Sequence, residues 1–199
     1  FEYTGAVSDD AAWRERAKGR AQTAEYLARS LQPLGAFIGA LNALASKALD
    51  KRGERLEDPR QQFENAPRGR WGEAVRSIAD AGLVKWDGEA GIEFMNVGST
   101  RFLNGGWLEE FAWHTVLEQQ AFDVRSSVNG SWQAGAAAIN EFDLLATHYN
   151  QLLFMECKTL RHGREDAAEK DSDILYKLDS LGRDARGLFG SSWLLAARR

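Results

Sequence analysis

The sequence is poor in cysteine, proline and histidine, and these shortages limit what the protein can be. Only one of its 199 residues is cysteine, so an intramolecular disulfide is impossible and a reducing compartment, the cytoplasm, is expected. Only three residues are proline, and the three histidines show no metal-ligand spacing. A metal site built on histidine or on a pair of cysteines is therefore not expected.

The sequence also lacks a long apolar run and an excess of positive charge. The best membrane candidate, Leu34–Leu49, is interrupted by Asn42, Ser46 and Lys47, so no membrane partner is expected. The formal net charge of −4 gives no general attraction for nucleic acid, and any such binding must depend on a local basic surface. Hydrophobic residues make up 44% and charged residues 27%, which is typical of a soluble globular protein.

The first half of the chain is predicted to be mainly helical. Apolar spacing predicts helices over residues 11–31, 34–49 and 71–82, followed by short strands over 83–86 and 92–95. Helices followed by a small hairpin resemble a winged-helix module, but helix Trp71–Ala81 carries only Arg76 against Glu73 and Asp80, which is poor chemistry for a DNA groove. We therefore expect a spacer domain over residues 1–97. The charged stretch 51–70 is interpreted as a solvated connection, with phosphate binding as the alternative.

The second half, residues 98–199, is predicted to be a mixed α/β domain. A helix from Trp107 is followed by strands over residues 122–128, 139–146 and 151–158, a helix over 173–181 and a strand over 193–197. Asn129-Gly130 is predicted to form a hairpin turn. Because the chain begins on Phe1 rather than Met and ends in a predicted strand, we expect a fragment of a longer protein.

The two strands that flank a polar turn near residue 149 carry the main chemical signal. Strand side chains alternate between faces, so Glu156 and Lys158 are expected to point the same way. Asp143 lies in the middle of the preceding strand, where a charge is costly unless it has a partner or a function. Two acids beside an amine suit a divalent metal ion and an activated water.

A third acid is expected to come from the helix that begins at Trp107. At 100° per residue, Glu109 falls at the edge of the apolar face, near Ala112, whereas Glu110 falls on the outer side with His114. Glu109, not Glu110, is therefore predicted to lean toward the sheet. The alternative is that both acids only complement the helix dipole at a surface.

Together these residues predict a site for hydrolysis of a phosphodiester. Asp143, Glu156, Glu109 and the backbone carbonyl of Cys157 are expected to hold Mg²⁺ or Mn²⁺, because hard cations prefer oxygen ligands. Lys158 is expected to orient the attacking water and to neutralise negative charge.

The same residues resemble the PD-(D/E)xK nuclease pattern. Asp143 matches its Asp, Glu156 its second acid and Lys158 its lysine, whereas Phe142 stands where the name of the motif has proline. The surrounding sequence resembles that of one subgroup, the effector nucleases of type III CRISPR defence that carry an N-terminal CARF sensor domain. That resemblance is carried by Gly-Gly-Trp-Leu-Glu at 105–109, Asn-Glu-Phe-Asp at 140–143, Glu-Cys-Lys-Thr at 156–159 and Leu-Tyr-Lys-Leu at 175–178.

The resemblance implies a restriction-endonuclease-like mixed sheet flanked by helices, over residues 98–199, that cleaves DNA or RNA as a homodimer. It also implies activation by a cyclic oligoadenylate through a sensor domain that no stretch of this chain resembles. Lys177 matches a family lysine that could touch a phosphate, with a solvated helix position as an equal alternative. Glu141 shares a face with Asp143, and both a supporting role at the site and a hydrogen-bonding role at the sheet edge are open.

Two rival hypotheses belong to other classes. The first is a non-catalytic nucleic-acid-binding winged-helix protein with a degenerate nuclease scaffold, although the intact Asp, Glu and Lys argue against it. The second is a structural dimerisation module, in which the acids form ordinary ion pairs with Lys158. Stabilisation of the fold by a divalent ion separates these from the nuclease.

Overall fold

The computed structural model describes residues 2–131, 140–159 and 190–197, and the chain divides into two compact units. One, here called the sheet unit, comprises Phe1–Ala21 and Leu108–Ala197. The other, here called the helical unit, comprises Gln22–Trp107. The expected domain boundary between residues 97 and 98 stays a prediction.

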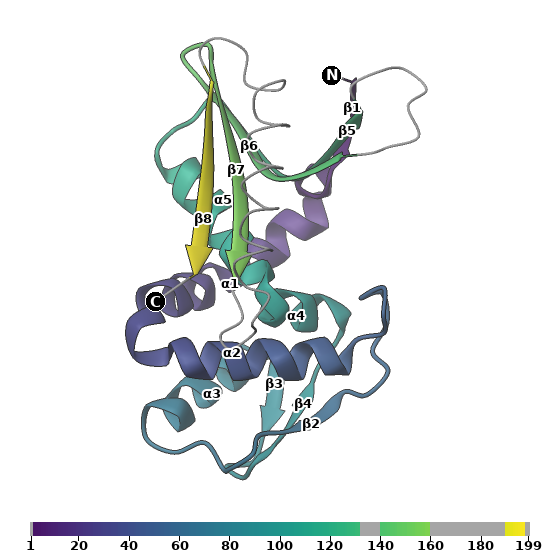
Figure 1. Ribbon diagram of the computed structural model, residues 1–199, viewed down its shortest axis with the longest axis vertical. Coiled ribbons are helices and arrows are strands. Elements are labelled where there is room, and N and C mark those ends of the chain that lie inside the picture. Colours follow the sequence, from purple (N-terminus) through teal and green to yellow (C-terminus); the bar gives the residue numbers. More distant parts are fainter. Residues whose placement is uncertain (1, 132–139, 160–189, 198–199) are drawn as a thin grey trace, which may run out of the picture. The chain divides into compact units, whose positions relative to one another are not determined.

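The sheet unit contains a five-stranded mixed sheet with helices packed beside it (Figure 1). The strand order is β1-β5-β6-β7-β8; all neighbours are antiparallel except β7 and β8, which are parallel. Its elements are β1 (Glu2–Ala6), η1 (Val7–Asp9), the first part of α1 (Ala11–Arg29), α5 (Trp107–Glu118), β5 (Asp123–Ser131), β6 (Asn140–His148), β7 (Gln151–Thr159) and β8 (Ser191–Ala197). The expected mixed sheet flanked by helices is confirmed. The predicted helix 173–181 lies outside the described residues.

Strand β5 is longer than the sequence predicted. The Asn129-Gly130 turn is wrong, because both residues lie inside β5, where Gly130 pairs with Tyr3 of β1 on one side and with Asn140 of β6 on the other. The N-terminal strand β1, for which no element was predicted from the sequence, supplies the second partner, as Glu2 pairs with Ser131. A backbone that is hydrogen-bonded on both sides outweighs a local turn preference.

The core of the sheet unit is built from aromatic and aliphatic side chains of three neighbouring strands. Val128, Phe142 and Phe154 form a buried cluster. The rings of Phe142 and Phe154 meet nearly edge to face, with centroids 5.0 Å apart. Because a protein interior is close-packed, this cluster fixes β5, β6 and β7 against one another beside the acids predicted to be functional.

The helical unit places helices around a three-stranded sheet of order β2-β4-β3. Its elements are the rest of α1, α2 (Leu31–Ala48), β2 (Arg60–Gln62), α3 (Arg70–Asp80), β3 (Val84–Trp86), β4 (Gly91–Phe94), α4 (Val97–Arg101) and η2 (Phe102–Gly106). The predicted helices and hairpin are confirmed, but the break after α1 falls at Ser30. Pro33 lies in the first turn of α2, where its missing N–H has no helical partner to lose.

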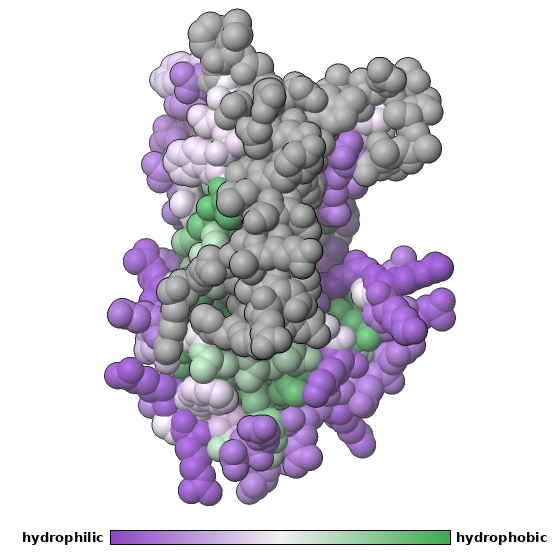
Figure 2. All heavy atoms as spheres, in the orientation of Figure 1, coloured by the Kyte–Doolittle hydropathy of each residue, from purple (hydrophilic) through white to green (hydrophobic). Residues whose placement is uncertain are grey.

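Strand β2 is an element that the sequence did not predict. It is only three residues long and lies in the charged stretch interpreted as a connection, so its pattern is too short to recognise. Its partner is β4, through the pairs Arg60↔Glu93 and Gln62↔Gly91. Hydrophilic side chains ring the visible face of the helical unit, with hydrophobic side chains exposed between them (Figure 2). Among the described helices, none is both long and apolar enough to cross a lipid bilayer.

Candidate active site

The candidate site lies in the sheet unit, at the point where β6 and β7 stop pairing. The two strands join through Tyr149 and Asn150, which both have positive φ, as a two-residue hairpin turn of type I′ requires. Pairing then runs from His148↔Gln151 to Leu144↔Met155. This confirms the predicted hairpin and places Asp143 and Glu156 immediately beyond the last pair.

The carboxylate of Asp143 takes over as hydrogen-bond acceptor where the backbone ladder ends. Its Oδ2 accepts a hydrogen bond of 2.7 Å from the backbone N–H of Cys157. Asp143 is 9% exposed and Glu156 only 1%. A buried N–H requires an acceptor. This bond therefore provides one for the N–H of Cys157 and fixes the Asp143 carboxylate where β6 and β7 diverge.

Lys158 lies between the two acids. Its Nζ is 2.7 Å from Glu156 Oε1 and 3.4 Å from Asp143 Oδ2. Burial alone would lower the pKa of Lys158, but the negative charges of Asp143 and Glu156 and its hydrogen bonds to them raise its pKa above the usual value. The ammonium therefore stays charged, and the shared direction of Glu156 and Lys158 expected from strand alternation is observed.

Glu109, near the start of α5, shares this electrostatic environment. Burial, followed by the negative charges of Asp143 and Glu141, raises the pKa of Glu109 to about 8, against the opposing effects of Lys158 and a hydrogen bond from Ser127. Glu109 and Asp143 thus interact electrostatically, although Glu109 belongs to α5 and Asp143 to β6. Glu141 itself is exposed, and its predicted supporting role stays a prediction.

The neighbouring acid, Glu110, differs from its expected place on the outer side of α5. It is 5% exposed and forms an ion pair with Arg20 of α1. His114, expected on the same outer side, is half-buried, with its Nε2 3.0 Å from the carbonyl oxygen of Ala17. Helix α1 covers this side of α5, which a helical projection of α5 alone cannot reveal.

Ser127 is a candidate positioning residue that sequence reasoning missed. It lies within β5 between the pairs Ser126↔Leu144 and Val128↔Phe142, which places it across from Asp143. Its φ of 50° is unusual for a residue other than glycine, and its Oγ donates a 3.5 Å hydrogen bond to Glu109 Oε2. Such backbone strain often accompanies functional sites, but no sequence pattern announces it. Lys177 lies outside the described residues.

The donor chemistry of this site fits a hard divalent cation. Carboxylates and a backbone carbonyl are the ligands that Mg²⁺ and Mn²⁺ prefer. A bound cation would counteract both the burial and the neighbouring negative charges that raise the pKa of Glu109. Within the described ranges, however, no three His, Cys, Asp or Glu side chains are grouped closely enough to hold one ion as they stand. The positive charge between Asp143 and Glu156 is that of Lys158.

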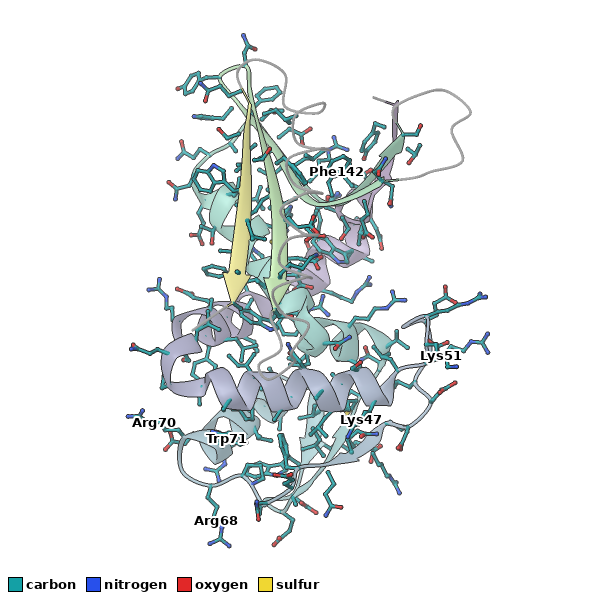
Figure 3. The ribbon with its side chains drawn as sticks, in the orientation of Figure 1. Lys47, Lys51, Arg68, Arg70, Trp71 and Phe142 are labelled. Atoms are coloured by element: carbon teal, nitrogen blue, oxygen red, sulfur yellow. The ribbon has the colours of Figure 1, made fainter. Side chains whose placement is uncertain are left out.

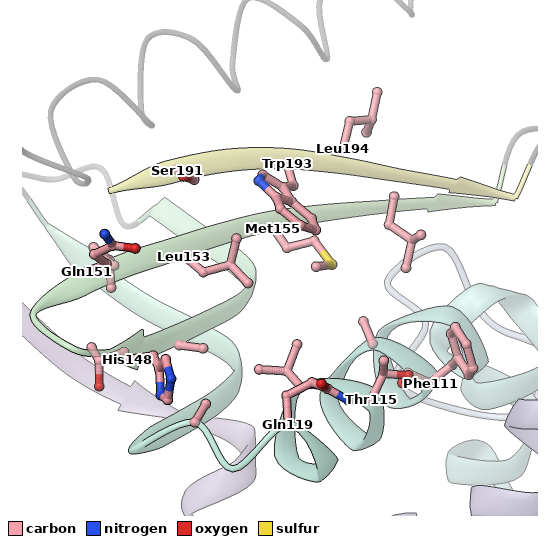
Figure 4. Close-up of a pocket in the computed structure, with 17 residues that line it drawn as sticks. Phe111, Thr115, Gln119, His148, Gln151, Leu153, Met155, Ser191, Trp193 and Leu194 are labelled. Carbon is pink, nitrogen blue, oxygen red and sulfur yellow. Dashed lines mark hydrogen bonds between the residues drawn. The ribbon is translucent and has the colours of Figure 1, made fainter. Parts of the chain in front are cut away.

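A separate apolar cavity lies between α5 and strands β6 to β8 (Figure 4). Its volume is about 600 Å³, and its walls include Phe111, Leu153, Met155 and Trp193. Its lining does not include Lys158 or any of the acids Glu109, Asp143 and Glu156. The cavity is therefore distinct from the candidate active site.

Comparisons with known proteins agree with this fold. Residues 97–199 match the family described as "Card1-like, endonuclease domain". Among solved structures, protein VC1899 from Vibrio cholerae is 25% identical with a TM-score of 0.74, and the alignment covers 92% of this chain and 47% of that protein. Can2 from Sulfobacillus thermosulfidooxidans, solved in complex with cyclic tetra-adenylate, is 21% identical with a TM-score of 0.70, with coverages of 91% and 47%.

The chain thus spans less than half the length of these two proteins. No curated protein sequence matches it at a significant level.

Proposed function

The chain belongs to the Card1-like endonuclease domain family, and from this premise we propose that it is a metal-dependent nuclease that hydrolyses phosphodiester bonds of DNA or RNA. The observation that carries the proposal is the position of Lys158. Its ammonium lies 2.7 Å from Glu156 and 3.4 Å from Asp143, where the backbone pairing of β6 and β7 has ended. Burying two acids costs free energy, and the stability of a sheet does not require them at that point.

Asp143, Glu156, Glu109 and the carbonyl of Cys157 would hold Mg²⁺ or Mn²⁺ in this proposal. When bound, the ion would supply positive charge for the developing phosphorane and lower the pKa of a bound water. The residues of the chain divide the remaining work. The N–H of Cys157 orients Asp143, and the Lys158 ammonium positions the water and neutralises charge on the phosphate.

The wider biological role is also a proposal. The motifs around residues 105–109 and 156–159 favour a CRISPR-associated effector that acts as a homodimer. The complex of Can2 with cyclic tetra-adenylate favours a cyclic oligoadenylate as the activator. Because the chain spans only part of such proteins, we place the binding of this activator outside these 199 residues.

The direct test is cleavage of labelled single-stranded RNA, single-stranded DNA and plasmid with Mn²⁺, by the wild-type chain and by Lys158→Ala. We expect cleavage of at least one substrate, lost on addition of a chelator and in the variant. Lys85→Ala, which removes an exposed lysine from a surface ion pair, is the matched control and should cleave normally. If full-length protein with cyclic oligoadenylates added is also inactive, and no divalent ion stabilises it, the rival non-catalytic scaffold replaces the nuclease.

A further inference from the structure

A second cavity, in the helical unit, combines an aromatic wall with positive charge. Its volume is about 500 Å³, and it is bounded by the end of α2, the loop after β2 and the start of α3. Trp71 and Phe63 supply aromatic surface, whereas Lys47 and Arg68 supply charge. Figure 3 labels Lys47 on α2, Trp71 on α3 and Arg68 in the loop that precedes α3.

The aromatic wall is held in place from behind. The ring centroid of Trp71 lies 5.5 Å from that of Phe37 and 6.5 Å from that of Phe63. The rings of Phe37 and Phe63 are stacked, with their centroids 6.1 Å apart. Phe37 and Phe63 are buried, but Trp71 is only half-buried. A large indole ring, fixed by packing and partly exposed in a cavity wall, is a platform on which another flat ring can stack.

The two cationic side chains at this cavity, Lys47 and Arg68, are available to bind a ligand. In the part of the chain that the structure describes, neither the Lys47 nor the Arg68 side chain has an ion pair or a hydrogen bond, and both are exposed. Glu64 also lines the rim, but the two cations outweigh its single negative charge. Exposed amides of Gln62 and Asn65 line the same cavity and offer both donors and acceptors.

We propose that this cavity binds one unpaired nucleotide of a single-stranded nucleic acid, with the base stacked on Trp71 and the adjoining phosphates contacted by Lys47 and Arg68. Its volume is in the range of small-ligand sites, and stacking requires a base that is not already paired within a duplex. This inference rests on the proposed function, because it gives the nuclease a substrate contact in addition to its cleavage site. It also explains how a chain with a net charge of −4 engages a polyanion.

The test is binding of a fluorescein-labelled oligothymidylate of about 15 nucleotides, a length near the upper end of single-strand site sizes. Anisotropy is measured with the full 199-residue chain in EDTA, so that no cleavage occurs. The test variant is Lys47→Gln with Arg68→Gln. The matched control is Lys51→Gln with Arg76→Gln, which removes the same charge from exposed positions of the helical unit that do not line the cavity.

We expect the test variant to bind about tenfold more weakly than the control at 0.1 M salt. The slope of log K against log salt concentration should also be shallower by about 1.4, because two phosphate contacts are lost. Trp71→Phe, which keeps an aromatic ring against Phe37, should also weaken binding. Ultraviolet cross-linking of an oligonucleotide that carries 5-iodouracil should label the peptide containing Trp71. An affinity of the test variant no lower than that of the control overturns the inference, as does a duplex that binds as tightly as the single strand.

Cleavage assays separate this inference from the proposed function. A chain that binds the oligonucleotide through Lys47 and Arg68 but cleaves nothing contradicts the nuclease and leaves the binding site standing. A chain that cleaves normally, with a KM unchanged in the test variant, contradicts the binding site and leaves the nuclease standing.

Discussion

At the scale of single residues, Lys158 has two roles that one substitution can expose together. In Lys158→Met, the buried carboxylate of Glu156 loses the ammonium 2.7 Å away, so the free energy of unfolding should fall by about 2 kcal/mol without divalent ions. Cleavage should fall by at least about 100-fold, as expected when a group that positions the water is lost. Urea unfolding in EDTA measures the first effect, and initial rates with Mn²⁺ measure the second.

Lys85→Met is the control for both measurements. Lys85 pairs with Glu93, and their side chains are 65% and 34% exposed, so solvent screens the pair and its loss should change neither stability nor rate appreciably. Equal stability and equal activity of Lys158→Met and the wild type would contradict the role given to Lys158.

Glu109 predicts an unusual dependence of stability on pH. Its pKa of about 8 in the folded chain lies above the ordinary value of 4.5, so the folded state keeps a proton that the unfolded state releases. Without divalent ions, its contribution to stability therefore falls as pH rises from 4.5 to about 8. In Glu109→Gln, which cannot ionise, that loss should be absent. The free energy of unfolding of the variant should therefore increase relative to that of the wild type between pH 5 and pH 8.

Urea unfolding in EDTA at several pH values measures this difference. Glu89→Gln, an exposed position in the turn between β3 and β4, should leave the wild-type profile unchanged. Parallel profiles for Glu109→Gln and the wild type would show that Glu109 does not titrate in this window.

The residues of the site differ in how far the sequence could predict them. The shared direction of Glu156 and Lys158 follows from strand alternation, which is local and therefore readable. The burial of Glu110 depends on Arg20, far away in the sequence, and the positive φ of Ser127 depends on the surrounding sheet. Neither has a local signature.

At the scale of elements, the Arg20–Glu110 ion pair connects α1 to α5 within the sheet unit. The side chains are 12% and 6% exposed, and burial raises the pKa of Glu110 even against the opposing charge of Arg20. Arg20→Met leaves Glu110 as a buried acid without this partner and should lower the free energy of unfolding by about 3 kcal/mol. Urea unfolding at pH 7 measures the loss.

Two variants make this prediction sharper. Lys18→Met removes the Lys18–Glu15 pair from the same helix, but those side chains are 62% and 72% exposed, so stability should not change measurably. Arg20→Met combined with Glu110→Met replaces the pair by apolar groups and should recover much of the loss. A single Arg20→Met variant as stable as the wild type would contradict a structural role for the pair.

The prediction of elements from sequence succeeded and failed for one physical reason. Helices α1, α2 and α3 and the β6–β7 hairpin were found because their signals lie within the element or its turn. Strand β2, with only three residues, and the full length of β5 were missed, since both depend on partners distant in the chain. In particular, β1 keeps Asn129 and Gly130 extended although that dipeptide favours a turn.

At the scale of the whole molecule, a divalent ion should stabilise the folded chain by mass action if the carboxylates form a site. An ion at about 100 times its dissociation constant adds about 2.7 kcal/mol, provided that it binds the folded state alone. For a chain of this size that corresponds to a rise in Tm of about 5–10 °C. Calorimetry across a series of Mg²⁺ and Mn²⁺ concentrations measures the rise.

Glu156→Gln gives this prediction its force. The substitution keeps the size of a side chain that is only 1% exposed but removes the charge that both Lys158 and a bound cation require. The rise in Tm should therefore vanish in this variant and persist in Glu57→Gln, an exposed position in the helical unit. If Glu156→Gln responds to the ions as the wild type does, then the ions act elsewhere, and the acids around Lys158 are ion pairs of a structural scaffold.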